Sequence, residues 1–162
     1  VFVGFKNEFK GKGYGSMIRT GETSEFDWKG YVPFEHLPFS YNPENGFISS
    51  ANNKTVSSDY PYYISFRYAL PYRINRIREM LNEETKFGID DFKRMVTDQH
   101  SDYAALLTPH ILNLKSRLTE MSPTEAEAFS TLANWDFDMN KNLTAPAVFE
   151  FFTRSEARRV GK

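Results

Sequence analysis

Residues 27–38 read Asp-Trp-Lys-Gly-Tyr-Val-Pro-Phe-Glu-His-Leu-Pro, and residues 41–53 read Tyr-Asn-Pro-Glu-Asn-Gly-Phe-Ile-Ser-Ser-Ala-Asn-Asn. The run from Asn42 to Gly46 is typical of a turn, because an Asn-Gly pair adopts positive φ at little cost. A short apolar strand follows and ends in two adjacent amides, Asn52 and Asn53. An amide held at a strand end can face a cleft and donate a hydrogen bond to an oxyanion. An Asn pair can equally close a loop, so the pair alone leaves both readings open.

The chain changes character near residue 70. Before it, Gly, Pro, Asn and aromatic residues surround short apolar runs, which predict short strands and ordered loops. These runs lie at residues 1–3, 14–18, 46–51 and 60–68. After it, the apolar residues recur with helical spacing. We therefore expect an α+β fold, β-rich first and helical second. Residues 1–69 form its strand and loop part, and 70–153 the helical part of the same domain.

The helical half carries three apolar stripes and two clear helix starts. Ser122 to Glu125 is a capping box with proline at the first helical position, and Thr144 to Pro146 opens a last helix. We expect Pro109 to bend or restart the third helix. The stripes are Ile74, Ile77 and Leu81; Phe92, Met95 and Val96; and Leu107, Ile111, Leu114 and Leu118.

Composition excludes several classes of protein. The 162 residues include 20 basic and 21 acidic side chains, so no bulk field favours nucleic acid or an anionic membrane. Cysteine is absent, which excludes disulfides and thiolate chemistry and is compatible with a periplasmic or secreted protein. No apolar run approaches the roughly 20 residues that span a bilayer. Because the chain starts at Val1 in an apolar run, we expect a piece of a longer protein.

The last segment, residues 154–162, differs from the rest. It is basic and nearly free of apolar residues. It closely resembles the translated read-through of a sequencing adapter. We therefore expect a disordered or artefactual tail there, in preference to a basic arm for nucleic acid.

Three other patterns invite a chemical interpretation. The glycines of residues 11–15 lack the spacing of a phosphate loop, which favours a hairpin connection. Asp98 and Asp102 lie four residues apart on a predicted helix with His100 between them, but the imidazole points off their shared face. A solvated or cap-forming role is therefore preferred to a cation site. His36 and His110 have no identifiable Ser or Asp partner, so we expect structural roles for both.

The order of motifs resembles the β-chain of penicillin acylases and acyl-homoserine-lactone acylases, which are hydrolases with an N-terminal nucleophile. Residues 28–35 are similar to a Trp-x-Gly-x-x-Pro-Phe-Glu run, and 42–48 to Asn-Pro-x-x-Gly-aromatic-Ile. An Asn-Asn pair at 52–53 and Asp-Tyr-Pro at 59–61 follow in the family's order. The likeness continues through residues 73–77, 98–104 and 132–136, and covers about residues 10–153.

This resemblance implies a four-layer αββα sandwich that hydrolyses a small-molecule acyl amide through an acyl-enzyme. The nucleophile would be an N-terminal Ser upstream of this chain, and the remainder of an α/β heterodimer would be its partner. By position, the resemblance makes Asn52 the oxyanion donor and Arg73 the residue that orients it. Several family members bind calcium partly through an Asp shortly after Tyr-Pro. Here Tyr60 and Pro61 are followed by Tyr62, Tyr63 and Ile64, so the expected Asp is missing. We therefore expect no metal or other cofactor in this segment.

A second class of function competes with the hydrolase. Aromatic residues that look exposed could form a flat platform that binds carbohydrate or protein. In that case Asn52 would be only a loop residue. The aromatic residues are Trp28, Tyr31, Phe34, Tyr41 and Tyr62.

Overall fold

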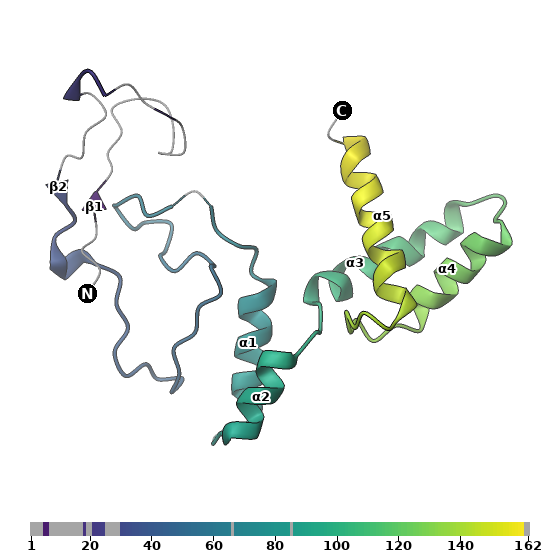
Figure 1. Cartoon of the computed structure of the whole chain (residues 1–162), viewed down its shortest axis with the longest axis horizontal. Coiled ribbons are helices and arrows are strands. Elements are labelled where there is room, and N and C mark those ends of the chain that lie inside the picture. The colour runs from purple at the N-terminus through teal and green to yellow at the C-terminus, as the bar shows by residue number, and fades with distance from the viewer. Residues whose placement is uncertain are drawn as a thin grey trace. The chain divides into compact units, whose positions relative to one another are not determined.

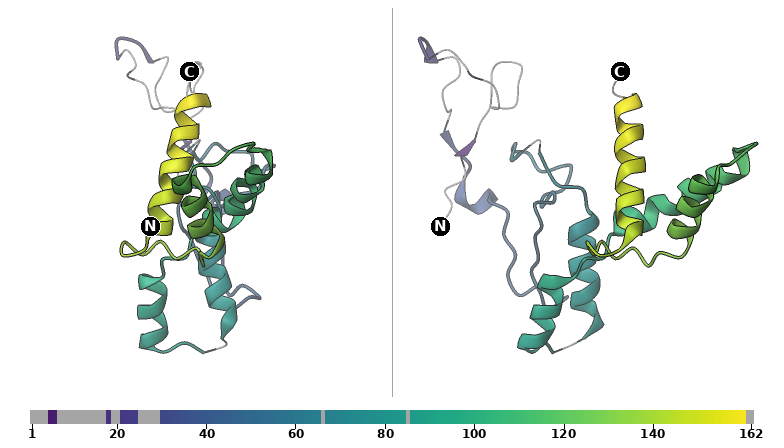
Figure 2. Two further views of the ribbon diagram at one scale, coloured as in Figure 1. Left: turned by 90° about the vertical axis from the view of Figure 1, so that its right-hand side faces the viewer. Right: turned by 45° about the vertical axis from the view of Figure 1, so that its right-hand side comes forward.

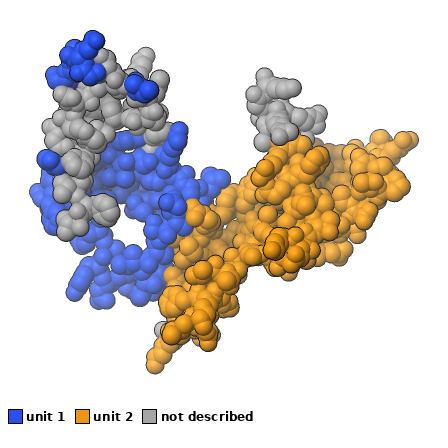
Figure 3. All heavy atoms as spheres, in the orientation of Figure 1, with its two compact units in different colours: residues 1–71 blue, residues 72–162 orange. Residues whose placement is uncertain are grey.

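The computed structural model describes residues 5–6, 18, 21–24, 30–65, 67–84 and 86–160, with backbone alone at 5–6, 30 and 156–160. The chain divides into two compact units, residues 1–71 and residues 72–162 (Figure 3). Each unit is described by itself below. No helix in the described part is long and apolar enough to cross a membrane.

The first unit contains little regular structure where it is described. Strand β1 (Phe5–Lys6) pairs antiparallel with β2 (Gly30–Tyr31), with Phe5 opposite Tyr31. One turn of 3-10 helix, η2 (Phe34–His36), follows. The other described residues between 30 and 71 form loops and turns (Figure 1). The hairpin predicted at residues 11–15 lies outside the described residues.

The prediction of a β-rich first part is wrong for the described residues. Residues 46–51 and 60–68 were expected to include strands, and their described residues form loop. A strand is stable only when its N–H and C=O groups find partners on a neighbouring strand. Among the described residues such pairing of strands is confined to β1 and β2. The predicted turn is confirmed, because Gly46 N–H donates to the Pro43 carbonyl over 2.9 Å with φ of 75° at Gly46.

The second unit is helical, as predicted from the apolar spacing (Figure 2). The predicted capping box of α4 is present: Ser122 Oγ accepts from Glu125 N–H at 3.3 Å, and Ser122 N–H donates to Glu125 Oε2 at 2.8 Å. The helices are α1 (Tyr72–Glu83), α2 (Ile89–Thr97), α3 (Asp102–Asn113), α4 (Pro123–Ala133) and α5 (Thr144–Val160), with a 3-10 turn, η3 (Leu114–Arg117), after α3.

Three details of the helical half differ from the prediction. Helix α3 is continuous through Pro109, so this proline does not restart it. The stripe expected to continue to Leu118 ends with α3, because the chain tightens into η3 at Leu114. Helix α5 runs on through residues 154–160, which are therefore helical where disorder was expected. Whether this tail is an artefact stays untested.

The core of the second unit lies where α3, α4 and α5 pack against each other. Phe149 of α5 is 1% exposed and sits at its centre. Its ring lies 5.5 Å from that of Trp135 and 5.9 Å from that of Tyr103, centroid to centroid. The other buried members of this core are Ala104, Ile111, Leu132 and Ala145.

Candidate functional site

Asn52, the predicted oxyanion donor, lies in an exposed loop of the first unit. Its φ of 60° places it in the left-handed region, which few residues other than glycine adopt and in which Asn is enriched. Its carbonyl accepts a hydrogen bond from Ala69 N–H over 2.7 Å. The backbone of Asn52 is thus fixed by a residue far along the chain.

The neighbouring Asn53 uses its side chain within the loop. Its Oδ1 accepts from the N–H of the buried Ala51 at 3.1 Å, and its Nδ2 donates to the Lys54 carbonyl at 2.9 Å. Both ends of this amide are therefore occupied by backbone groups. Asn53 thus has the structural role that an Asn pair commonly has.

Arg73, the residue predicted to orient Asn52, lies in the first turn of α1 and is exposed. It belongs to the second unit, whereas Asn52 belongs to the first. The orienting role of Arg73 stays a prediction.

His36 has a partner that the sequence did not reveal. Its Nδ1 lies 2.6 Å from the Tyr62 hydroxyl, and the two rings stack with centroids 5.6 Å apart. The Tyr60 hydroxyl donates to the His36 carbonyl over 2.8 Å. Because these residues are separated by 24 and 26 positions, no local pattern in the sequence indicates the contact. His110 is exposed, in the last turn of α3.

The trio of Asp98, His100 and Asp102 does not lie on one helix, contrary to the prediction. Helix α2 ends with Asp98 as its C-cap residue, and α3 begins at Asp102 after its N-cap, Ser101. Asp98 pairs with Arg76, whose Nε and second guanidinium nitrogen lie 3.0 and 2.9 Å from its two carboxylate oxygens. His100 Nε2 lies 3.5 Å from Asp102 Oδ1. A solvated or cap-forming role was predicted for these residues, and Asp98 is the C-cap residue of α2.

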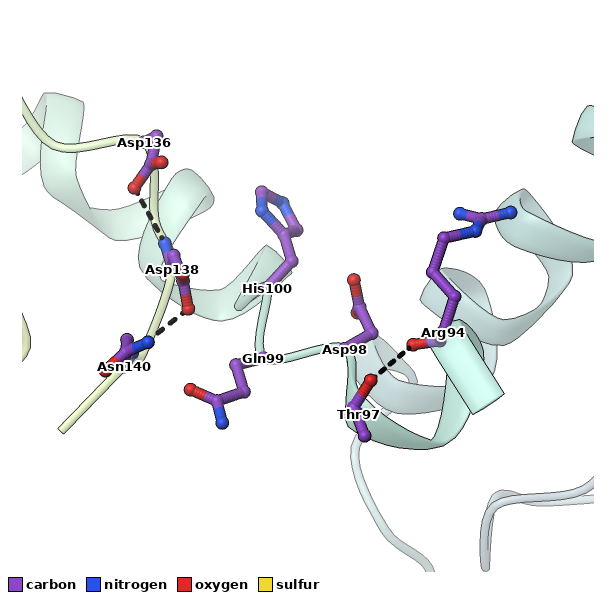
Figure 4. A pocket seen from close by; sticks show the side chains of 8 residues that line it. All are labelled: Arg94, Thr97, Asp98, Gln99, His100, Asp136, Asp138 and Asn140. Atoms are coloured by element: carbon purple, nitrogen blue, oxygen red, sulfur yellow. Dashed lines mark hydrogen bonds between the residues drawn. The ribbon is translucent and has the colours of Figure 1, made fainter. Parts of the chain in front are cut away.

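A polar pocket of about 390 Å³ opens beside this break between helices (Figure 4). Two of its carboxylates are engaged in local turns, since Asp136 Oδ1 accepts from Asp138 N–H at 3.1 Å and Asp138 Oδ1 from Asn140 N–H at 3.0 Å. Such turns are typical of a structural role. The pocket is lined by Arg94, Thr97, Asp98, Gln99, His100, Asp136, Asp138 and Asn140.

The Arg76–Asp98 pair makes the second unit sensitive to acid. The hydrogen bonds from Arg76 hold the pKa of Asp98 below its ordinary value of 3.8. A lowered pKa means that the carboxylate stabilises the fold above the unfolded pKa and that this contribution disappears as pH falls through the folded pKa. We expect Asp98→Asn to lower the free energy of unfolding by about 1–3 kcal/mol at neutral pH, and the difference from wild type to shrink in acid. Urea unfolding of the isolated chain across a pH series measures it.

Asp90→Asn is the matched control for this measurement. The Asp90 side chain is 93% exposed and pairs with Lys93 on the surface. Such exposed pairs contribute roughly 0–1 kcal/mol. An Asp98→Asn difference that stays constant from neutral pH to acid would contradict the role given to the Arg76–Asp98 pair.

A comparison with known protein families shows to which family the chain belongs. The sequence profile of the penicillin amidase family matches residues 6–161. The chain belongs to the penicillin amidase family. This confirms the resemblance drawn from the motifs at residues 28–61, and the family implies the fold of hydrolases with an N-terminal nucleophile.

Individual relatives of this penicillin amidase family member are considerably longer. Penicillin acylase 2 proenzyme of Pseudomonas sp. (strain SE83) is 33% identical over 86% of this chain and 18% of its own length. Acyl-homoserine lactone acylase QuiP of Pseudomonas syringae pv. tomato is 25% identical over 92% of the chain and 19% of its own. Penicillin G acylase of Escherichia coli is 28% identical over 76% of the chain and 15% of its own. The chain thus spans less than a fifth of each of these relatives.

A calcium site of the kind expected in the penicillin amidase family does not fit the segment after Pro61. Tyr62, Tyr63 and Ile64 carry no carboxylate, and the Tyr62 hydroxyl is hydrogen-bonded to His36. In the part of the chain that the structure describes, no group of three or more His, Asp or Glu residues is arranged to hold a metal ion. That this segment binds no metal or other cofactor stays a prediction.

The aromatic residues considered for a binding platform differ in how exposed they are. Tyr31, Phe34 and Tyr41 are 65%, 78% and 88% exposed, whereas Tyr62 is half-buried and paired with His36. Trp28 lies outside the described residues. Tyr31, Phe34 and Tyr41 are therefore the exposed members of this set among the described residues.

Proposed function

We propose that this chain is part of an amidohydrolase that cleaves the C–N bond of a small acyl amide. The nucleophile is an N-terminal Ser outside these residues, and its own α-amine acts as the base. Attack on the carbonyl carbon gives an acyl-enzyme and releases the amine, and water then frees the acid. Membership of the penicillin amidase family supports this proposal, together with relatives whose names are penicillin acylase and acyl-homoserine lactone acylase.

In this proposal Asn52 donates its side-chain N–H to the oxyanion of the tetrahedral intermediate. The single observation that carries the assignment is the fixed backbone of Asn52. Its φ of 60° lies in the left-handed region, and its carbonyl accepts a hydrogen bond from Ala69 N–H over 2.7 Å. A donor on a well-fixed backbone suits preorganised stabilisation of an oxyanion.

Arg73 has a supporting role in the same proposal. Its guanidinium orients the Asn52 amide and does not contact the substrate. The rest of the acylase is the partner of this chain and carries the nucleophile and most of the acyl pocket. We further propose a periplasmic or secreted enzyme, in keeping with the absence of cysteine.

Comparison of the isolated chain with the complete protein tests the proposal. We expect the isolated 162-residue chain to release no product from phenylacetyl or fatty-acyl amides in a single-turnover assay. The reason is that oxyanion donors without a nucleophile give little acceleration. The complete, matured protein should hydrolyse at least one amide of the panel.

Two outcomes contradict the proposal. One is turnover by the isolated chain that survives repurification. The other is a complete protein that binds carbohydrate or protein and hydrolyses no amide, which would favour a role for the exposed aromatic residues Tyr31, Phe34 and Tyr41 in binding.

A further inference from the structure

Three side chains of the first unit form a contact set that the proposed mechanism does not use. We call His36, Tyr60 and Tyr62 the imidazole–phenol cluster. The Tyr62 hydroxyl lies 2.6 Å from His36 Nδ1, and the Tyr60 hydroxyl donates to the His36 carbonyl over 2.8 Å. The Tyr60 and Tyr62 rings meet edge to face, with centroids 5.7 Å apart. Both hydroxyls therefore bind the same residue, one at its ring and one at its backbone.

The position of this cluster in the chain connects it to Asn52. The Ala69 N–H bond to the Asn52 carbonyl closes a loop over residues 52–69, and Tyr60 and Tyr62 lie within that loop. His36 is the last residue of η2, which lies outside it. The cluster thus ties the middle of the loop to a separate segment. A loop of this length held only at its ends keeps considerable conformational freedom.

We infer that the imidazole–phenol cluster positions Asn52 for the reaction, an inference that rests on the proposed role of Asn52. Its members contact neither the substrate nor the reacting atoms, and act through the loop backbone. Asn52 sits in a sparsely populated backbone region, so its conformation depends on what surrounds it. A shift of about 1 Å in such a donor is enough to weaken catalysis strongly.

Removal of one hydroxyl at a time tests the inference in the complete, matured acylase. Tyr62→Phe keeps the ring stacked on His36 and removes one hydrogen bond. We expect kcat to fall about 3- to 10-fold, the equivalent of one net hydrogen bond, with KM little changed. Tyr60→Phe should act in the same direction. Tyr68→Phe is the control, because Tyr68 is a phenol of the same loop that lies outside the imidazole–phenol cluster.

A double-mutant cycle separates positioning from general stability. If Tyr62 acts through Asn52, then adding Tyr62→Phe to Asn52→Ala should cause no further loss of kcat. A purely structural role predicts instead that losses add and that they follow the midpoint of thermal unfolding. Substrate concentration series with each variant give kcat and KM separately.

The outcomes distinguish this inference from the function on which it rests. A large loss in Asn52→Ala together with an additive loss in Tyr62→Phe would overturn the positioning role alone. Tyr62→Phe and Tyr60→Phe variants that both behave like Tyr68→Phe would overturn it as well. An Asn52→Ala variant with normal kcat would remove both the proposed function of Asn52 and the inference.

Discussion

Replacing Asn52 by alanine is expected to lower kcat of the complete, matured acylase by roughly 100- to 1000-fold. This corresponds to about 3–4 kcal/mol of transition-state stabilisation, the usual cost of losing one oxyanion donor. KM should change far less, because the hydrogen bond forms mainly once negative charge develops on the carbonyl oxygen. Steady-state kinetics on the best amide substrate measures both quantities.

The neighbouring residues give graded controls for that result. Asn53→Ala should cost distinctly less, since its amide serves Ala51 and Lys54 inside the loop. Arg73→Ala should fall between the two, because it acts by misorienting Asn52. Maturation of every variant has to be checked by N-terminal sequencing, because the proposed mechanism requires a Ser at a new N-terminus. Losses in all three variants that simply follow thermal stability would show that the residues only order the chain.

Phe149→Ala is expected to have the largest effect on stability. Phe149 is 1% exposed and its ring contacts those of Trp135 and Tyr103. Replacing a fully buried phenylalanine by alanine costs about 3–5 kcal/mol, through lost burial and the cavity that remains. Urea unfolding of the isolated chain, followed by far-UV circular dichroism, should therefore show a large shift of the midpoint.

Phe151→Ala is the matched control on the same helix. Phe151 lies two residues along α5 and is 79% exposed in this chain. Exposed substitutions of this kind usually change stability by less than about 0.5 kcal/mol. Equal shifts of the unfolding midpoint in Phe149→Ala and Phe151→Ala would contradict the packing of α5 described here.

Local signals in the sequence predicted the helical half well. The capping box at Ser122 depends on residues three apart, and the spacing of Ile74, Ile77 and Leu81 depends on the helical period alone. The turn from Asn42 to Gly46 is equally local. Such signals do not require knowledge of distant parts of the chain. These predictions were confirmed because the interactions behind them join residues that are close together in the sequence.

Predictions that depend on distant partners were less successful. A strand needs a neighbour, and the described chain provides pairing only for β1 and β2, so residues 46–51 form loop. The contact of His36 with Tyr62 crosses 26 residues and has no local signature. Within the break between Asp98 and Asp102, His100 pairs with Asp138 in an isolated β-bridge. Apolar spacing cannot indicate such a pairing.

At the candidate site, too, the sequence predicted what depends on local motifs and missed what depends on distant contacts. The motif order at residues 28–61 was enough to place the chain in its family and to single out Asn52. It could not indicate the positive φ of Asn52 or the bond from Ala69, since both depend on the folded loop. The relation of Asn52 to Arg73 depends on how two separate units meet, which no pattern within either segment determines.

The rate of acyl-enzyme formation in a single turnover tests the central claim most directly. The complete, matured protein and its Asn52→Ala variant are mixed with limiting amide, and the acyl adduct is followed by intact mass spectrometry and located by peptide mapping. The account predicts an adduct on an N-terminal Ser outside residues 1–162, forming roughly 100- to 1000-fold more slowly in the variant. An adduct on a residue within this chain, or an unchanged rate of acylation in Asn52→Ala, would contradict it.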